Sequence, residues 1–380
     1  MSDTRPPPPK HEPPKGEPQT WTLEELKKHC LTATILELHT IPIYLYSAYC
    51  IKSEAVATFR KIIGVVKQEM LHLGLAGNIL AAIGGTPTLY GLKSTPEYPC
   101  QIFYDPIDLH LMPPNQDAIE SFVRLEAPTE VPDRPRGNIL PGYPSIGAFY
   151  ESLKRGIKTV HDQMAKEGKA LFDPQYTDRQ FTPDDGSYGD EMTQIKTLDD
   201  ALNAMELIIE QGEGTQVTTP AAPGQETSHW QIFQSLLGAD IPHYDTVQDP
   251  KVDDPSFSDN IKTAMRAFDA VYCYLLLSIE NVWANVSEDN RNNLLSNIDS
   301  MMRGMLQPIA KFLVTQKVND TEGSKYAAPP FNFYNFDSVD SAKDEMIQRL
   351  TEAKEAYPTG PFASQITKAK NLFDLKDLNN

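Results

Sequence analysis

Two short motifs of the form Glu-x-x-His hold the residues with the clearest chemical potential. The first pairs Glu69 with His72, and the second pairs Glu226 with His229. Residues three apart in a helix share a face, so each motif sets a carboxylate beside an imidazole. A carboxylate turned into an apolar interior is unfavourable unless it is paired or bound to a cation. Helical bundles that hold two metal ions use pairs of this kind.

Either motif alone is more typical of a solvated or salt-bridged pair on a surface. Their joint presence favours a metal site, because each motif is preceded along the chain by a glutamate on an apolar helix face. Glu37 interrupts one such face, and Glu213 continues another. Glu210 is the alternative to Glu213 as the ligand from that helix.

The candidate metal ligands, which are also the predicted catalytic residues, are Glu37, Glu69, His72, Glu213, Glu226 and His229. Four carboxylates balance the charge of two divalent cations, so a buried site of this kind carries little net charge. Imidazole together with carboxylate favours iron or manganese over copper. We therefore predict two iron ions, with manganese as the alternative.

Long amphipathic helices must position these ligands. Apolar residues recur at helical spacing over the predicted helices, which span 22–52, 53–84, 145–169, 197–212, 256–286, 288–318 and 339–356. Glu37 and Glu69 lie at nearly equal distances along the chain from the turn predicted at Lys52-Ser53. Each residue advances a helix by ~1.5 Å. Antiparallel helices joined at that turn therefore bring both carboxylates to one level.

Two stretches between the helices predict loops. Residues 89–144 are rich in proline and predict an extended insertion with one short helix at 117–124. Residues 172–196 are polar and rich in glycine and aspartate, which predicts a second loop. Loops carried on a rigid scaffold often form binding sites, so both are candidates for the wall of a substrate pocket.

Composition restricts the classes of partner. The 380 residues carry a net charge of −18, which argues against nucleic acid and against an anionic membrane surface. The sequence has no apolar run long enough for a membrane span and no secretory signal, so a cytoplasmic protein is predicted. We expect a disordered Pro-rich tail over 1–20, a metal-binding domain over 21–336 and a helical extension over 337–380.

Several segments, taken in chain order, resemble a ferritin-like family that includes the iminophenyl-pyruvate dimer synthase domain of violacein-type pigment pathways. The segments are Leu36–Pro42, Val66–Leu73, Phe122–Pro128, Ser145–Tyr150, Gln211–Thr215, Glu226–His229 and Ala327–Phe331. The resemblance runs over about residues 23–334. It implies an all-α, ferritin-like four-helix bundle with a dinuclear non-haem metal site, surrounded by additional helices and long Pro-rich loop insertions.

The predicted function is that of a non-haem dinuclear iron oxidase or oxygenase acting with O2 on a small organic substrate. The resemblance favours secondary metabolism and oxidative coupling of an amino-acid-derived imine. No G-x-G-x-x-G segment follows a strand, so electrons must come from the substrate or from an external donor. Two alternatives stay open: a catalase-like or metal-storage protein, and a non-catalytic binding module. The oligomeric state, including a homodimer, also stays open.

Overall fold

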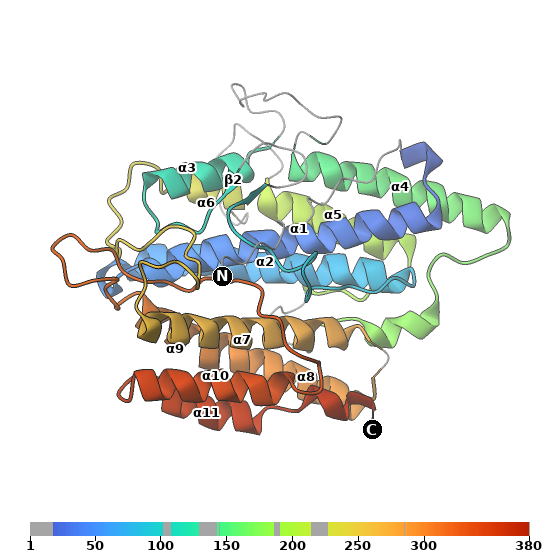
Figure 1. Ribbon diagram of the computed structural model, residues 1–380. Coiled ribbons are helices and arrows are strands. Elements are labelled where there is room, and N and C mark those ends of the chain that lie inside the picture. The colour runs from blue at the N-terminus through green and yellow to red at the C-terminus, as the bar shows by residue number, and fades with distance from the viewer. Residues whose placement is uncertain are drawn as a thin grey trace.

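Two long antiparallel helices, α1 (Leu23–Cys50) and α2 (Val56–Ala82), run through the middle of the molecule (Figure 1). The computed structural model describes residues 18–101, 108–128, 143, 145–185, 191–213, 227–284 and 286–379. Most of the predicted tail, 1–20, therefore lies outside the described residues. The side chain of Thr22 accepts from the amide of Glu25, whose own side chain accepts from the amide of Thr22. This reciprocal cap explains why α1 begins there.

Four helices close into a bundle. α1 contacts α2 and α4 (Ile146–Lys166), and α5 (Leu198–Gly212) contacts the same two neighbours. Both α4 and α5 begin after a residue whose side chain caps the first turn, Ser145 and Thr197. A 3₁₀ turn, Ser53–Ala55, joins α1 to α2. The predicted all-α fold with a four-helix bundle is confirmed.

Shorter elements lie over the bundle at its upper side in Figure 1. The short helix predicted at 117–124 is present as α3 (Gln116–Leu125), and it contacts α6 (His229–Gln234). Strand β1 (Cys100–Gln101) pairs antiparallel with β2 (Asp108–Leu109), which is the one sheet in the described part of the chain. The loop predicted at 172–196 contains a 3₁₀ segment, Pro174–Arg179.

The remaining helices form a layer below α1 and α2 in Figure 1. They are α7 (Asp259–Val282), α8 (Glu288–Met301), α9 (Gln307–Leu313), α10 (Ala342–Ala356) and α11 (Phe362–Asn371), with a π-helical segment at Met302–Leu306 and a 3₁₀ segment at Leu375–Asn379. The sequence predicts one helix over 288–318 with a kink at Pro308, and the structure interrupts this helix with the π segment directly before that proline's turn. None of the helices within the described ranges combines the length and the apolar character that crossing a bilayer requires.

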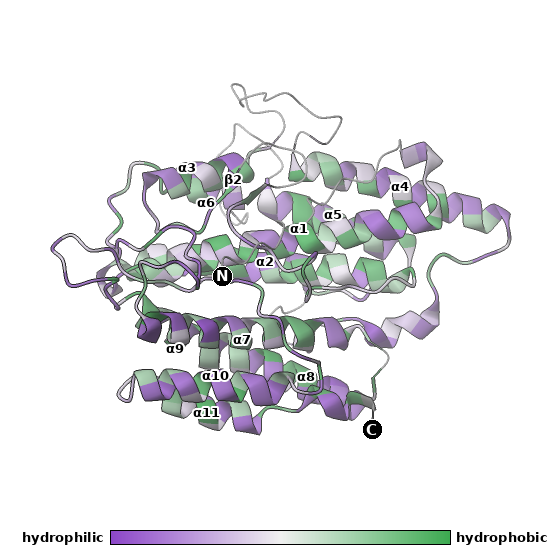
Figure 2. Cartoon of the chain, in the orientation of Figure 1, coloured by the Kyte–Doolittle hydropathy of each residue, from purple (hydrophilic) through white to green (hydrophobic). Residues whose placement is uncertain are grey.

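Helix α7 is the core of this lower layer. Every residue from 267 to 278 is buried. α10 covers α7 through apolar residues that are themselves buried, namely Met346, Leu350 and Ala353. The visible face of α10 is mainly polar (Figure 2). Residues within the predicted C-terminal extension thus pack against α7.

Asn78 fastens the loop after α4 to the buried face of α2. Its Nδ2 donates to the carbonyl oxygens of Phe181 and Thr193, at 2.9 and 3.0 Å. Its Oδ1 accepts from the amide of Phe181 at 2.8 Å and from the indole of Trp283 at 3.0 Å. The side chain is fully buried. One buried amide therefore satisfies four hydrogen-bonding groups.

Lys311, on α9, supplies the C-terminal cap of α1. Its Nζ donates to the carbonyl oxygens of Tyr49 at 2.9 Å, Ile51 at 3.1 Å and Ala48 at 3.4 Å. The last carbonyls of a helix lack partners within the helix, and a cation there is favourable. The contact also ties the lower layer to the bundle.

Lys311→Met is expected to lower the free energy of unfolding by about 2–3 kcal/mol, because the carbonyls at the end of α1 lose a charged donor. Urea denaturation followed by helical circular dichroism measures the change. Lys317→Met, at an exposed position, removes the same charge and should leave the midpoint nearly unchanged. Equal shifts in the two variants would show that the capping contact is not what matters.

Candidate metal centre

Glu37 and Glu69 meet at one level of the bundle, as the spacing predicts. The Nδ1 of His72 lies 3.7 Å from Oε2 of Glu37 and 3.7 Å from Oε2 of Glu69. The hydroxyl of Thr40 also donates to Oε2 of Glu69, at 2.9 Å. All four side chains are buried. The levels agree because α1 and α2 leave their shared turn with the same rise per residue.

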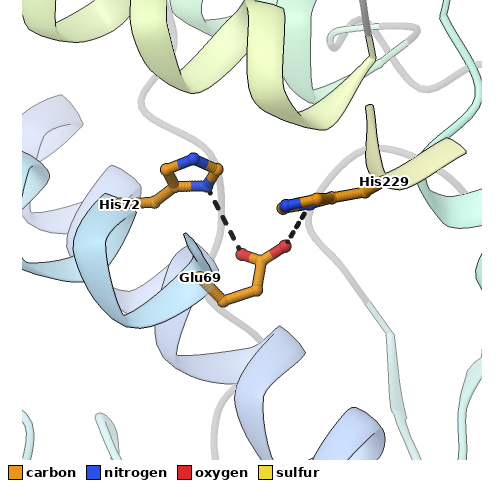
Figure 3. Close-up of side chains that lie close together, drawn as sticks. All are labelled: Glu69, His72 and His229. Carbon is orange, nitrogen blue, oxygen red and sulfur yellow. Dashed lines mark ion pairs between the residues drawn. The ribbon is translucent and has the colours of Figure 1, made fainter. Parts of the chain in front are cut away.

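His229 joins this cluster from the first turn of α6. Its Nδ1 lies 2.8 Å from Oε1 of Glu69 and 3.6 Å from Oε2 of Glu126. Glu69 therefore stands between the rings of His72 and His229, with one oxygen toward each (Figure 3). The centroids of the two rings are 5.4 Å apart.

Two buried tyrosines hold the outer carboxylates. Tyr150 donates to Oε1 of Glu37, and Tyr44 donates to Oε1 of Glu126. In each of these glutamates the second oxygen, Oε2, is left facing a histidine. The two sides of the cluster are therefore built alike around Glu69.

Two glutamines contact the outer nitrogens of the histidines. Nε2 of His72 lies 3.0 Å from Oε1 of Gln211, and Nε2 of His229 lies 3.1 Å from Oε1 of Gln68. An amide oxygen accepts hydrogen bonds and never donates them. A neutral histidine in this contact carries its proton on Nε2, which leaves Nδ1 bare toward the carboxylates.

The crowded carboxylates perturb one another and the histidines. Burial raises the pKa of Glu37 well above its usual range, and the charge of Glu69 raises it further. Burial opposes a charge on His229, but the carboxylates of Glu69 and Glu126 outweigh that effect and raise the pKa of His229 to about 10. Burial likewise opposes the charge of Glu69, yet the two histidines lower the pKa of Glu69 below its ordinary value. When no metal cation is bound, protons therefore compensate the negative charge of the carboxylates in this cluster.

The donor atoms suit divalent transition metals. The His72 half comprises Glu37, Glu69 and His72, and the His229 half comprises Glu69, Glu126 and His229. Ligand atoms of Glu69, His72 and His229 all lie within 4.8 Å of one another. The buried Nδ1 of His229 faces the carboxylates of Glu69 and Glu126. Carboxylate oxygen with imidazole nitrogen is a donor set that iron and manganese accept, so the residues present fit such an ion on either side of Glu69.

The metal-free protein is expected to lose stability as the pH rises from about 6.5 to about 10. Folding raises the pKa of His229 from 6.5 to about 10. The stability gained from this proton is therefore fully present below the pKa of the unfolded state, 6.5, and is lost as the pH rises through the pKa of the folded state, about 10. The raised pKa of Glu37 acts in the same direction. Unfolding midpoints measured against pH test this, and His229→Gln should make the decline shallower. A flat wild-type curve over this range would contradict the assignment.

Four of the six predicted ligands lie together: Glu37, Glu69, His72 and His229. Glu213 is buried as the C-cap of α5, and its Oε1 accepts from the amide of Gly147 at 2.7 Å. A Cβ at position 147 would lie 2.5 Å from Oε2 of Glu213, so only glycine lets this carboxylate approach so closely. Glu210 is exposed.

The second Glu-x-x-His motif is not arranged as predicted. α6 begins at His229, with Ser228 as its N-cap, so this helix does not reach back through residues 227 and 228 as the motif predicts. α6 ends at Gln234, and Leu237 beyond it is 41% exposed. Glu226 lies outside the described residues. The cause is local, because the hydroxyl of Ser228 accepts from the amide three residues later and starts the helix there.

Glu126 is a buried acid of the cluster that the predicted ligand set lacks. It is the C-cap of α3, where the helix dipole disfavours a negative charge. Its side chain is nevertheless 3% exposed and lies beside His229. The available sequence signal is its position four residues after Phe122, on the apolar side of a short helix.

A sequence profile of the ferritin-like family matches residues 31–238, which is more than half of the chain and includes the whole cluster. The chain belongs to the ferritin-like family. The resemblance noted in the sequence is thereby confirmed. A crystal structure of a ferritin-like protein from Caulobacter vibrioides matches with a TM-score of 0.53 and 24% identity, covering 74% of this chain and 96% of that one. This likeness shows that the fold is shared.

Two relatives of this ferritin-like protein are much longer than it is. Dichlorochromopyrrolate synthase from Lentzea aerocolonigenes is 24% identical over 308 residues, which is 71% of this chain and 29% of that protein. The 2-imino-3-(indol-3-yl)propanoate dimerase from Chromobacterium violaceum is 22% identical over 346 residues, which is 78% of this chain and 33% of that protein. The matched region thus spans about a third or less of either relative.

Proposed function

We propose that this ferritin-like protein is a non-haem dinuclear iron oxidase or oxygenase, with manganese as the alternative metal. The observation that carries the proposal is the position of Glu69, whose two oxygens face two different histidines, His72 and His229. A carboxylate in that position suits a bridging role between two ions. Each histidine would hold its ion together with the outer glutamate beside it, Glu37 for His72 and Glu126 for His229.

Further carboxylates complete the proposed site. Glu213 and Glu226 stay candidate ligands, because a fourth carboxylate would balance the charge of two divalent ions. The buried position of Glu213 favours it over the exposed Glu210. Glu126 joins the proposed set on the strength of its contact with His229.

The protein groups around the ions have defined tasks. When bound, the pair of ions supplies electrons to O2 and makes it reactive toward an organic molecule. Tyr44 and Tyr150 fix one oxygen of each outer carboxylate, so that the other oxygen keeps its direction. Glu69 holds the two halves in register. The burial of these groups keeps bulk water away from the reaction.

The substrate class that we propose is an amino-acid-derived imine, which is coupled oxidatively to a second molecule of its kind. One relative is named as a dimerase of 2-imino-3-(indol-3-yl)propanoate, which supports this class. Joining two such molecules through one new bond removes two protons and two electrons. O2 accepts the two protons and the two electrons and becomes hydrogen peroxide, so this reaction needs no external electron donor.

Anaerobic loading with Fe²⁺ followed by exposure to O2 tests the proposal. We expect two iron ions per chain and, with the imine generated from tryptophan by an amino-acid oxidase, a product with the mass of two substrates less two hydrogen atoms. Metal-free protein should give no such product. Rapid O2 release from added peroxide without dimer formation would instead identify a catalase-like protein. A chain that binds no metal would be a non-catalytic binding module.

A further inference from the structure

Gln211 links a histidine of the site to a carboxylate at the surface. Its Oε1 lies 3.0 Å from Nε2 of His72, and its Nε2 donates to Oε1 of Glu191 at 3.0 Å. Gln211 is 5% exposed, whereas Glu191 is exposed. A continuous chain of hydrogen bonds therefore runs from the buried cluster to solvent.

We propose that Glu191 is a positioning residue that fixes the tautomer of His72 through Gln211. A carboxylate only accepts hydrogen bonds, so the NH2 group of Gln211 must face Glu191. The amide oxygen then faces His72 and can only accept from it. The ring proton of His72 is thus held on Nε2, and Nδ1 stays bare toward Glu37 and Glu69. The opposite amide orientation would set its oxygen against the carboxylate of Glu191.

The charge of Glu191 also strengthens the contact at the histidine. Hydrogen bonds in a chain polarise one another, so an anion at one end makes the amide oxygen a better acceptor. A stronger acceptor at Nε2 makes the other ring nitrogen a better electron donor, as carboxylate partners do for metal-binding histidines. His229 contacts Gln68 instead. The link to Glu191 therefore acts on the His72 half.

The loop that carries Glu191 is held firmly enough for this role. Asn78 binds it on both sides of Glu191, at Phe181 and Thr193. The side chain of Gln180 closes the same loop on Ile195, donating to its carbonyl at 2.8 Å and accepting from its amide at 2.6 Å. The backbone that follows Glu191 is therefore held in place by Asn78 and Gln180.

The test is the tautomer of His72 in metal-free protein, read from ¹⁵N chemical shifts of the imidazole nitrogens at a pH where the ring is neutral. Glu191→Lys replaces an acceptor with a pure donor, so Gln211 must turn its oxygen outward and its NH2 toward His72. We expect the proton to move from Nε2 to Nδ1 in this variant. Asp184→Lys, an equal charge change at an exposed position of the same loop, should leave the proton on Nε2.

A double variant supplies the rescue. Gln211→Glu combined with Glu191→Gln keeps an acceptor against His72 and reverses only the outer hydrogen bond, so the proton should return to Nε2. His229 is the internal control, and its signals should not change in any of these proteins. A proton that stays on Nε2 in Glu191→Lys, or one that moves equally in Asp184→Lys, would overturn the inference.

The predicted effect on metal binding rests on the proposed function. The predicted tautomer of His72 does not depend on it. Titration with Mn²⁺ should show affinity in the His72 half reduced about 10–100-fold by Glu191→Lys and restored in the double variant. Wild-type protein that binds no Mn²⁺ or Fe²⁺ would refute the proposed function and leave the tautomer result standing. Normal metal binding with an unchanged tautomer would refute the positioning role alone.

Discussion

Glu69→Gln is expected to weaken metal binding strongly in both halves of the site while the protein stays folded. Glu69 is the residue common to the two donor sets, with one oxygen toward each histidine. An amide of the same shape has no negative charge to share between two cations. Loss of a residue that only hydrogen-bonds to a metal ligand already lowers metal affinity about 10–100-fold. We therefore expect the loss of a ligand itself to lower the metal affinity of each half at least about 100-fold. Metal analysis after dialysis measures the loss.

Two matched variants make this result specific. Glu280→Gln changes a part-buried carboxylate outside the cluster, which accepts from the amides of Leu89 and Tyr90, and it should leave the metal content unchanged. Glu37→Gln should weaken binding in the His72 half alone, because the contact of Glu37 in the cluster is to that histidine. If Glu37→Gln and Glu69→Gln removed the same amount of metal, the bridging position of Glu69 would be wrong.

Asn78→Ala is expected to destabilise the protein by about 3–5 kcal/mol and to free the loop after α4. The substitution leaves two carbonyls, one amide and one indole N–H without their partner in a buried place. Hydrogen exchange of the Phe181 amide is the direct measurement, because that amide donates to Asn78. Its protection should fall far more than that of amides in α1.

Asn281→Ala is the control for this prediction. Asn281 is also a helical asparagine, but its Nδ2 donates to the carbonyl of Leu277 within its own helix. Loss of this hydrogen bond should lower the free energy of unfolding by about 1 kcal/mol at most. It should leave the hydrogen exchange of the Phe181 amide unchanged. Equal protection of Phe181 in wild type and in Asn78→Ala would show that the loop is held by other contacts.

The central helices and the level of the first two acids follow from sequence. Thr22 with Glu25 marks the start of α1 by a mechanism that needs no tertiary contact. The equal spacing of Glu37 and Glu69 from one turn is likewise local geometry. Both features survive folding because neither depends on which other segments pack nearby.

The remaining acids depend on tertiary structure, and here the sequence was a weaker guide. Glu213 continues an apolar face on a helical wheel, but α5 ends at Gly212 and the side chain turns to the amide of Gly147. Glu126 follows a short helix, where periodicity extends over too few residues to separate a buried acid from a solvated one. Its partners, Tyr44 and His229, are distant in sequence.

The C-terminal helices show the same limit. α11 starts at Phe362 directly after Pro361, and most of its residues are polar, so its pattern does not stand out. The helix predicted over 288–318 is expected to kink at Pro308, but the apolar pattern does not indicate the π-helical segment that precedes this proline. Tertiary contacts supply what the local pattern lacks, because α11 packs against α10 and the π segment, and α8, α9 and that segment pack against α7.

Because α7 is completely buried between residues 267 and 278, a reactive side chain in this stretch can report how often the structure around it opens. Cys273 lies in this stretch, and its thiol is fully covered. Its sulfur contacts the backbone of Asn332 and Tyr334, so an alkylating reagent reaches it only when the segment that holds these two residues parts from α7. The rate at which that one sulfur is modified would therefore time how often the protein opens, in water and without denaturant.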